Sequence, residues 1–230
     1  TDDVIVTVNA NPTAGAGADV PICLGKNTTL TATGGGTYAW GPNTNLSATN
    51  IASPVATPAA TITYTVTVTN GASCTSTDDV IVTVNANPTA GAGSDVPICL
   101  GKNTTLTATG GGTYAWGPNT NLSATNIASP VATPAATITY TVTVTNGASC
   151  TSTDNVIVTV NANPTAGAGS DVPICVGKST TLTATGGGSC AWSSGDNVAN
   201  TTVNPGATNT YTVTVTNGAS CTDTDDVIVT

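Results

Sequence analysis

The sequence predicts an all-β protein built from tandem β-sandwiches, and three observations carry that prediction. Val and Tyr alternate with Thr along residues 62–69, the period-two pattern of a half-buried strand. Gly, Pro and Asn recur at short intervals as turn signals. A long stretch of the chain is also repeated almost without change. Small β-branched residues at this density favour strands over helices.

Self-comparison divides the chain into repeats of one plan. The first two repeats differ at only two positions. The third has diverged and has a shorter segment between Trp192 and Tyr211, which marks a surface connection. The opening residues match the last strand of a repeat. The predicted domains are therefore a strand that closes a preceding repeat followed by three repeats, at residues 1–9, 10–85, 86–161 and 162–230.

Each repeat is expected to hold roughly six or seven short strands. In the closing hairpin, Asn70 and Gly71 are predicted to form the turn because both tolerate positive φ. Trp40 and Tyr64 are predicted to lie in the core. The other expected parts of the first repeat are a Gly/Ala-rich strand over 14–21, strands over 27–33 and 37–40, and a long connection over 41–61.

The chain is acidic and lacks several residues on which binding and catalysis depend. It has twelve Asp and no Glu against three Lys and no Arg, for a net charge of −9. This balance argues against nucleic acid, whose phosphates need cations, and against an anionic membrane surface. No segment approaches the run of about 18 apolar residues that spans a bilayer. Without His, Glu or Arg, a catalytic triad cannot be built, so we expect no enzyme.

The cysteines follow the repeats, and we predict that they form disulfides within each repeat. Such a bond would staple the loop before the second strand to the closing hairpin and contribute roughly 4 kcal/mol. Zinc is the rival interpretation, disfavoured because each repeat offers two such sulfurs, no His and no C-x-x-C motif. Disulfides place the protein outside the cytoplasm. The predicted pairs are Cys23 with Cys74, Cys99 with Cys150, and Cys175 with Cys221.

Cys190 stands outside this scheme. It takes the position of Tyr38 and Tyr114, two residues before Trp192. It is either a buried free thiol or half of an interchain bridge.

Some Asp residues near the repeat boundaries are weak candidates for Ca²⁺, which prefers oxygen ligands. Because these Asp residues are not the same in neighbouring repeats, we interpret the Asp residues as solubilising charges and expect no metal or other cofactor. A further possibility is an isopeptide bond between Lys26 and an Asn. The predicted disulfide already cross-links the repeat, so a second covalent cross-link is not expected. The calcium candidates are Asp78, Asp79 and Asp95.

N-x-[ST] sequons make covalent glycans a further expectation. Outward-facing threonines offer O-linked positions as well. Unmodified side chains on a sheet surface are the alternative. The sequon asparagines are Asn27, Asn45, Asn103, Asn121 and Asn200.

Two sequence stretches carry a family resemblance. Residues 192–196 read W-x-x-G-D, as in PKD domains, and ICLGKNTTLTATGGGTYAW is followed by TYTVTVTNGASCT. Together they resemble the tandem immunoglobulin-like or PKD-like repeats of giant surface and gliding-associated proteins of Bacteroidota. Cys74 departs from antibody-type domains because it lies beyond the strand that Tyr64 opens, so no antibody-like recognition loops are inferred. The resemblance implies an extracellular, cell-surface filament or adhesin stalk and names no ligand.

The fold class is therefore all-β, with tandem immunoglobulin-like (PKD-like) β-sandwich domains in a rod, because the linker at 85–88 is short and not Gly/Ser-rich. We predict a structural repeat segment of an extracellular stalk or fibril, a bacterial surface appendage, as part of a longer array. Its partners would be neighbouring repeats or copies of itself. The alternative is an adhesin module that binds glycans or a partner cell surface.

The opening strand at 1–9 has no repeat of its own, and a lone alternating strand is an aggregation hazard. Either it closes a preceding repeat in a longer array, which we favour, or it inserts into a neighbouring molecule and propagates a filament by strand addition.

Overall fold

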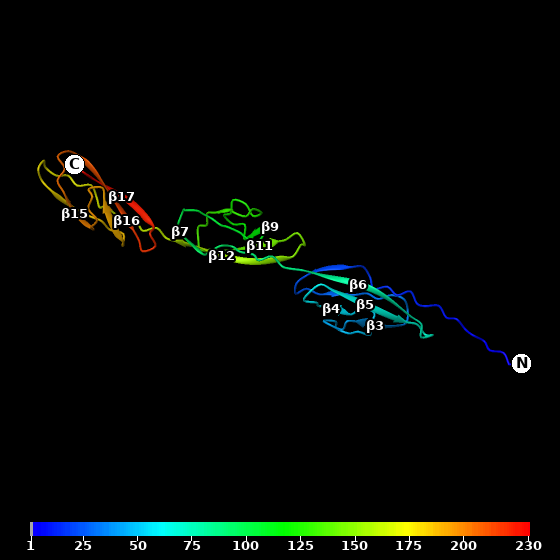
Figure 1. Cartoon of the computed structure of the whole chain (residues 1–230). Helices are drawn as coiled ribbons and strands as arrows, with labels where there is room; N and C mark the ends of the chain where they lie inside the picture. The colour runs from blue at the N-terminus through cyan, green and yellow to red at the C-terminus, as the bar shows by residue number, and fades with distance from the viewer. Residues whose placement is uncertain (1) are drawn as a thin grey trace. The chain divides into compact units, whose positions relative to one another are not determined.

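A computed structural model describes residues 2–230 and shows an all-β protein (Figure 1). The chain divides into two compact units. The boundary between them runs through the second repeat, so the predicted division at 10–85, 86–161 and 162–230 stays a prediction. The first unit holds the chain up to Thr89 together with Gly110–Thr113 and Val144–Ser152; the second holds Ala90–Thr109, Tyr114–Thr143 and Thr153–Thr230.

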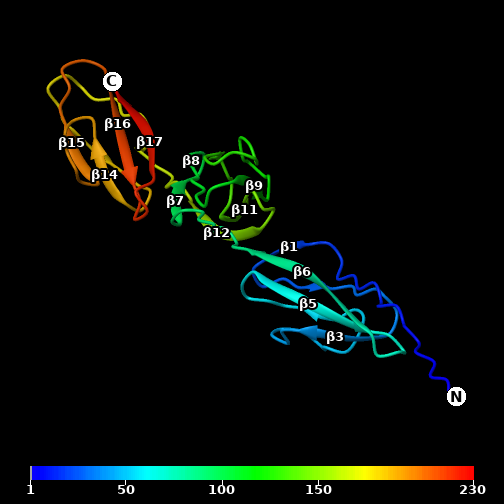
Figure 2. The ribbon, with the colours of Figure 1, turned by 45° about the vertical axis from the view of Figure 1, so that its right-hand side comes forward.

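The first sandwich has a four-stranded sheet in the order β1-β6-β5-β3 (Figure 2). Its second sheet is two-stranded and consists of β2 and β4. The pairing of β1 with β6 is parallel, and it places Cys23 opposite Asn85. All other pairs of these sheets are antiparallel. Its strands are β1 (Val20–Cys23), β2 (Thr28–Thr29), β3 (Thr37–Gly41), β4 (Val55–Ala56), β5 (Ile62–Thr69) and β6 (Thr75–Asn85).

The second sandwich repeats this plan, as its near-identical sequence requires. Its sheets have the orders β7-β12-β11-β9 and β10-β8, and β7 pairs with β12 in parallel. Its strands are β7 (Val96–Cys99), β8 (Thr104–Thr105), β9 (Thr113–Gly117), β10 (Val131–Ala132), β11 (Ile138–Thr145) and β12 (Thr151–Asn161).

The third sandwich differs where the sequence is shorter. After Trp192 the W-x-x-G-D segment makes a tight turn, in which the Gly195 amide donates to the Trp192 carbonyl at 2.9 Å. The Asp196 carboxylate accepts from the hydroxyls of Ser194 and Thr201. The small sheet of β13 and β15 now has four residues in each strand. The strands are β13 (Thr180–Thr183), β14 (Ser189–Trp192), β15 (Asn200–Val203), β16 (Asn209–Thr216) and β17 (Thr222–Val229), with the larger sheet ordered β14-β16-β17.

The core of the first sandwich confirms the period-two prediction. Val66 and Val68 are fully buried, as are Val80 and Val82, whereas Thr67 and Ile81, which lie between the members of each pair, are not. Each buried Val contributes about 1.5–3 kcal/mol relative to an exposed one. Trp40 is only 4% exposed, and its indole nitrogen donates to the Ile51 carbonyl at 3.0 Å. The polar atom of this ring is therefore satisfied inside the sandwich.

The Gly/Ala-rich opening segment differs from the strand predicted over 14–21. Only Val20–Cys23 forms β1, and Gly15 makes an isolated bridge to Thr33. Asp carboxylates take the place of the backbone hydrogen bonds that a strand over 14–19 would make to its neighbour. The Ala16 amide donates to Asp78 Oδ2 at 2.8 Å, and the Ile81 amide donates to Asp19 Oδ1 at 2.8 Å. Hydrogen bonds to a charged acceptor are roughly twice as strong as neutral ones, so they hold this segment without sheet pairing.

The turn of the closing hairpin also differs from the prediction. Residues 70–74 form a five-residue loop that includes the predicted Asn70 and Gly71, but the residue in the left-handed conformation is Ser73, at φ 63°. Asn70 Oδ1 accepts from the amides of Ala72 and Cys74 at 3.0 Å each. An Asx-type side chain thus shapes the turn in place of a glycine.

A closing strand was predicted over 1–9; residue 1 lies outside the described residues, and residues 2–9 form no strand in the described structure. This segment runs as a thin blue ribbon away from the first sandwich in Figure 1. Its apolar side chains are 81–90% exposed: Val4, Ile5, Val6 and Val8.

We expect Trp40→Ala to destabilise the first sandwich by roughly 3–5 kcal/mol, because it removes a buried aromatic ring and its hydrogen bond. Urea unfolding followed by circular dichroism measures the loss. Ile81→Ala, on the 38% exposed face of β6, is the matched control and should cost much less. Equal losses in the two variants would contradict a core role for Trp40.

Burial raises the pKa of the Tyr64 hydroxyl, which donates to the Thr44 carbonyl at 2.8 Å. Above about pH 10 the unfolded chain releases this proton while the folded chain keeps it, so the free energy of unfolding falls as pH rises. Urea unfolding between pH 8 and 11 should show a smaller alkaline loss for Tyr64→Phe than for the unmodified protein. Tyr38→Phe, at a half-buried tyrosine, serves as the control; identical pH profiles for Tyr64→Phe and the parent would refute this role for Tyr64.

Candidate functional site

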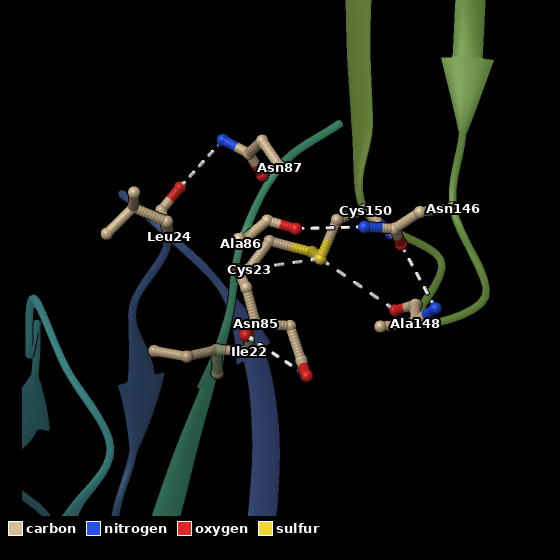
Figure 3. Close-up of a disulfide and its surroundings, with 9 residues drawn as sticks. All are labelled: Ile22, Cys23, Leu24, Asn85, Ala86, Asn87, Asn146, Ala148 and Cys150. Atoms are coloured by element: carbon tan, nitrogen blue, oxygen red, sulfur yellow. Dashed lines mark hydrogen bonds between the residues drawn. A yellow bond between two sulfur atoms is a disulfide. The ribbon is translucent and has the colours of Figure 1, made fainter. Parts of the chain in front are cut away.

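The candidate site is a joint between successive repeats, and one half of it is a closing hairpin. In the second repeat the hairpin between β11 and β12 is held by Asn146, whose Oδ1 accepts from the amides of Ala148 and Cys150 at 3.0 Å each. Ser149 takes φ 61°, as Ser73 does in the first repeat. The turn presents the Cys150 side chain at the tip of the hairpin (Figure 3).

The other half is the end of β1, together with the connection that follows β6. The Leu24 amide donates to the Asn85 carbonyl at 2.8 Å, and Asn87 Nδ2 donates to the Leu24 carbonyl at 3.2 Å. The Lys26 amide closes a turn on the Cys23 carbonyl at 2.9 Å. These contacts hold the connection and the end of β1 side by side, with Cys23 facing outward from the end of the strand (Figure 3).

A disulfide between Cys23 and Cys150 joins the two halves, with 5.5 Å between the Cα atoms. That separation lies in the preferred range for disulfides. Asn146 Nδ2 adds a hydrogen bond to the Ala86 carbonyl at 2.8 Å, and Cys150 Sγ lies 3.9 Å from the Asn85 carbonyl oxygen (Figure 3). Both cysteines belong to the first compact unit. The joint is therefore covalent and is reinforced by one Asn side chain.

The second joint lies in the second compact unit and has the same disulfide and asparagine contact. Cys99 and Cys221 are bonded, again with 5.5 Å between the Cα atoms. Asn217 Nδ2 donates to the Ala162 carbonyl at 2.8 Å, as Asn146 does at the first joint. Cys221, like Cys150, is fully buried. The joint is thus a repeated feature of the chain.

The prediction of disulfides within each repeat is wrong. Cys23 lies opposite Asn85 at one end of β6, whereas Cys74 immediately precedes Thr75 at the other end. An eleven-residue strand separates these ends by roughly 35 Å, far beyond the reach of a disulfide. The predicted pairs Cys23–Cys74, Cys99–Cys150 and Cys175–Cys221 are replaced by Cys23–Cys150 and Cys99–Cys221.

Three cysteines are free: Cys74, Cys175 and Cys190. Cys74 and Cys175 were predicted to be bonded, so this too is a correction. Cys190 is partly buried against the core of the third sandwich, and its thiol lies 3.9 Å from the Gly188 carbonyl oxygen. Whether it stays a free thiol or forms half of an interchain bridge remains a prediction.

The structure does not bring the calcium candidates together. Asp78 accepts from the Ala16 amide, Asp95 Oδ1 accepts from the Ile157 amide at 2.8 Å, and Asp79 lies opposite Thr65 in the sheet. Within residues 2–230 no group of three or more His, Cys, Asp or Glu side chains is placed to hold a metal ion. Asp78 and Asp95 instead bind backbone amides, a role that sequence reasoning missed.

All five sequon asparagines are exposed, so the acceptor amides are accessible: Asn27, Asn45, Asn103, Asn121 and Asn200. Their glycosylation stays a prediction. The part of the chain that the structure describes also contains no helix long and apolar enough to cross a membrane. Two disulfides point to an oxidising, extracellular setting.

Comparisons with known proteins agree with the fold. No family model and no curated protein matches the chain. The N-terminal eight immunoglobulin domains of Down Syndrome Cell Adhesion Molecule align at 13% identity and TM-score 0.52, over 95% of this chain and 36% of that chain. An I-band fragment of titin aligns at 14% identity and TM-score 0.47, over 97% of this chain and 99% of that chain. The protein is thus a set of tandem immunoglobulin-like β-sandwiches, and at these identities the likeness shows the fold alone.

A tryptic digest tests the disulfide pairing, because cleavage after the three lysines gives fragments 1–26, 27–102, 103–178 and 179–230. We expect monomeric protein with blocked free thiols, digested without reductant, to yield two linked species by mass spectrometry. One joins 1–26 to 103–178, and the other joins 27–102 to 179–230.

The within-repeat pairing would instead link all four fragments into one species, and that result would contradict the structure. Cys150→Ser is the control: it should release fragment 1–26 and leave the second linked species unchanged.

Proposed function

We propose that this chain is a structural repeat segment of an extracellular stalk or fibril, in which successive repeats act as covalently coupled links. The observation that carries the proposal is the joint itself: a hairpin of one repeat is bonded to the strand end of the preceding repeat, twice, by the same residues. A chain of separate binding modules has no need of such bonds. A structural element that must not come apart at its connections does.

The stabilisation that the two disulfides contribute fits this role. The two bonds close loops of 127 and 122 residues in sequence separation. In the chain-entropy model each is worth about 5 kcal/mol. That is comparable to the entire stability of a small domain, which is about 5–15 kcal/mol. The sandwiches have cores made mostly of small Val and Ala side chains, so this contribution is substantial for them.

The resemblance to repeats of surface and gliding-associated proteins of Bacteroidota supports a bacterial cell-surface appendage and a longer array of such repeats. In that setting the repeats would form a semi-rigid rod. Neighbouring repeats and copies of the chain are its proposed partners.

The alternative role, an adhesin that binds glycans or a cell surface, is less well supported. Aromatic rings in an exposed row are what glycan-binding faces usually present. Here Trp40, Trp116 and Trp192 are each 4% exposed, and Tyr64 and Tyr140 are fully buried. The aromatic residues are accounted for by the cores.

Electron microscopy of the native material tests the structural role. With gold-labelled antibodies against this chain, we expect label along continuous filaments, and a reductant that opens both disulfides should weaken the filaments against shear. Pre-immune antibodies give the background. Label confined to isolated globules, with no filament before or after reduction, would argue for a binding module instead.

A further inference from the structure

Each closing hairpin carries a glycine that the fold does not need. Gly71, Gly147 and Gly218 directly follow the asparagines that shape the three turns. The left-handed conformation of the turn belongs to a serine instead, which is Ser73 in the first hairpin. None of the three glycines has a φ angle in the left-handed region, and a Cβ added at any of them would meet nothing within 4 Å. Neither the backbone angle nor the available space therefore accounts for glycine at these positions.

What a glycine offers here is an unobstructed amide nitrogen. All three glycines are exposed. Within residues 2–230, the hydrogen bonds that hold each turn are made by the asparagine, by the serine and by the two other amides, and none is donated by the glycine amide. Every other asparagine in the chain precedes Ala, Pro, Thr, Leu, Ile or Val. The side chains of these residues crowd the following nitrogen, and a proline nitrogen has no proton to lose.

The side-chain carbonyl of the preceding asparagine is the matching electrophile. Asn146 Oδ1 accepts from the amides of Ala148 and Cys150 at 3.0 Å each (Figure 3). Two N–H donors on one carbonyl oxygen polarise the carbonyl and stabilise the oxygen when it becomes an oxyanion. The bond to the amide two residues ahead also folds the side chain back over the peptide that leads into Gly147. The other two hairpins have the same pair of contacts.

We propose that each hairpin modifies itself: the glycine nitrogen attacks Cγ of the preceding asparagine, which is converted to aspartate or isoaspartate. The nitrogen loses its proton to water and forms a bond to Cγ. The bond from Cγ to Nδ2 breaks, and Nδ2 takes up a proton and leaves as ammonia. Water then opens the resulting cyclic imide at either carbonyl. The sites are Asn70, Asn146 and Asn217, and this chemistry is independent of the structural role proposed above.

Conversion of Asn146 changes the joint to which it belongs. An aspartate still accepts from the Ala148 and Cys150 amides, but it has no donor for the Ala86 carbonyl, which Asn146 Nδ2 contacts at 2.8 Å. A carboxylate oxygen in that place repels the carbonyl oxygen, and isoaspartate also adds a methylene to the backbone of the turn. The disulfide between Cys23 and Cys150 remains. The joint therefore loosens without coming apart.

The first test follows the three asparagines in the full chain, with its disulfides formed, during incubation near neutral pH. Each asparagine lies in its own tryptic fragment, 27–102, 103–178 or 179–230, after final reduction. Mass spectrometry detects the change from amide to acid, and labelling by an isoaspartate methyltransferase identifies the isoaspartate. We expect conversion at Asn70, Asn146 and Asn217. Asn45 and Asn121, which precede leucine, are internal controls; equal conversion at the controls, or none at the three sites, overturns the proposal.

A comparison of folded and unfolded protein tests whether the hairpin takes part in the reaction. The chain is incubated in parallel in its native state and after reduction and unfolding in urea at the same pH. We expect the folded hairpins to react at least as fast as the unfolded chain, because the two amide donors are already in place. Slower conversion in the folded protein would mean that the hairpin protects its asparagine, and the proposal would fail.

A variant of the second hairpin tests the role of the glycine. Gly147→Ala should slow conversion at Asn146 by about tenfold or more, because the added methyl group holds the nitrogen and Cγ apart. The added Cβ has open space, so the turn itself should be retained. Asn70 and Asn217 in the same molecule serve as controls and should keep their rates. An unchanged rate at Asn146 contradicts attack by the glycine nitrogen.

Asn146→Asp tests the effect of conversion on the joint. Because Cys150 is fully buried and thiol–disulfide exchange depends on access, a loosened joint should let dithiothreitol reduce the Cys23–Cys150 bond about threefold faster or more. The Cys99–Cys221 bond, whose asparagine is unchanged, is the control in the same molecule and should keep its rate. Reduction of both bonds at their original rates would show that conversion leaves the joint closed and would overturn the loosening.

Discussion

The parallel pairing of the opening strand with the closing strand is the constraint on which the joints depend. Because β1 runs alongside β6 in the same direction, both reach the same end of the sandwich, and Cys23 arrives there beside Asn85. The hairpin that precedes β6 is necessarily at the opposite end. Each sandwich therefore carries one sulfur at each end, and a bond within a repeat is ruled out by the length of β6 alone.

One asparagine couples the shape of the hairpin to the contact it makes. At the first joint the amide oxygen of Asn146 holds the turn, while its amide nitrogen binds the connection at Ala86. An aspartate could keep the first function but has no donor for the second. The residue that shapes the tip of the hairpin is thus also the one that recognises the preceding repeat.

The parts of the fold that depend on local pattern could be predicted from the sequence. Alternation of Val and Tyr with Thr identified the first strand of the hairpin, and Trp40 and Tyr64 lie in the core as predicted. The opening segment could not be read this way, since Gly and Ala give no period and Asp78 and Asp19 supply the missing hydrogen bonds. The turn was misread because Asn70 acts through its side chain rather than through its own backbone angle.

The pairing of the cysteines was hidden for a different reason. Near-identical repeats place the same residues around Cys74 and Cys150, so local sequence cannot tell which of the two meets Cys23. The order of the elements along each repeat carried one indication. If the first strand of a repeat pairs in parallel with the last strand, the two cysteines of that repeat must lie at opposite ends of the sandwich. Sequence alone did not establish that pairing.

The two disulfide loops overlap, and this changes what a break in the backbone does. One bond spans the chain from Cys23 to Cys150 and the other from Cys99 to Cys221, so every peptide bond between Cys23 and Cys221 is bridged at least once. A protease that nicks an exposed connection anywhere in this stretch leaves the two pieces attached. If each disulfide were confined to a single repeat, cleavage of any linker between repeats would separate the chain into two pieces. Because the two loops overlap, the series of repeats stays covalently connected after a single backbone cleavage.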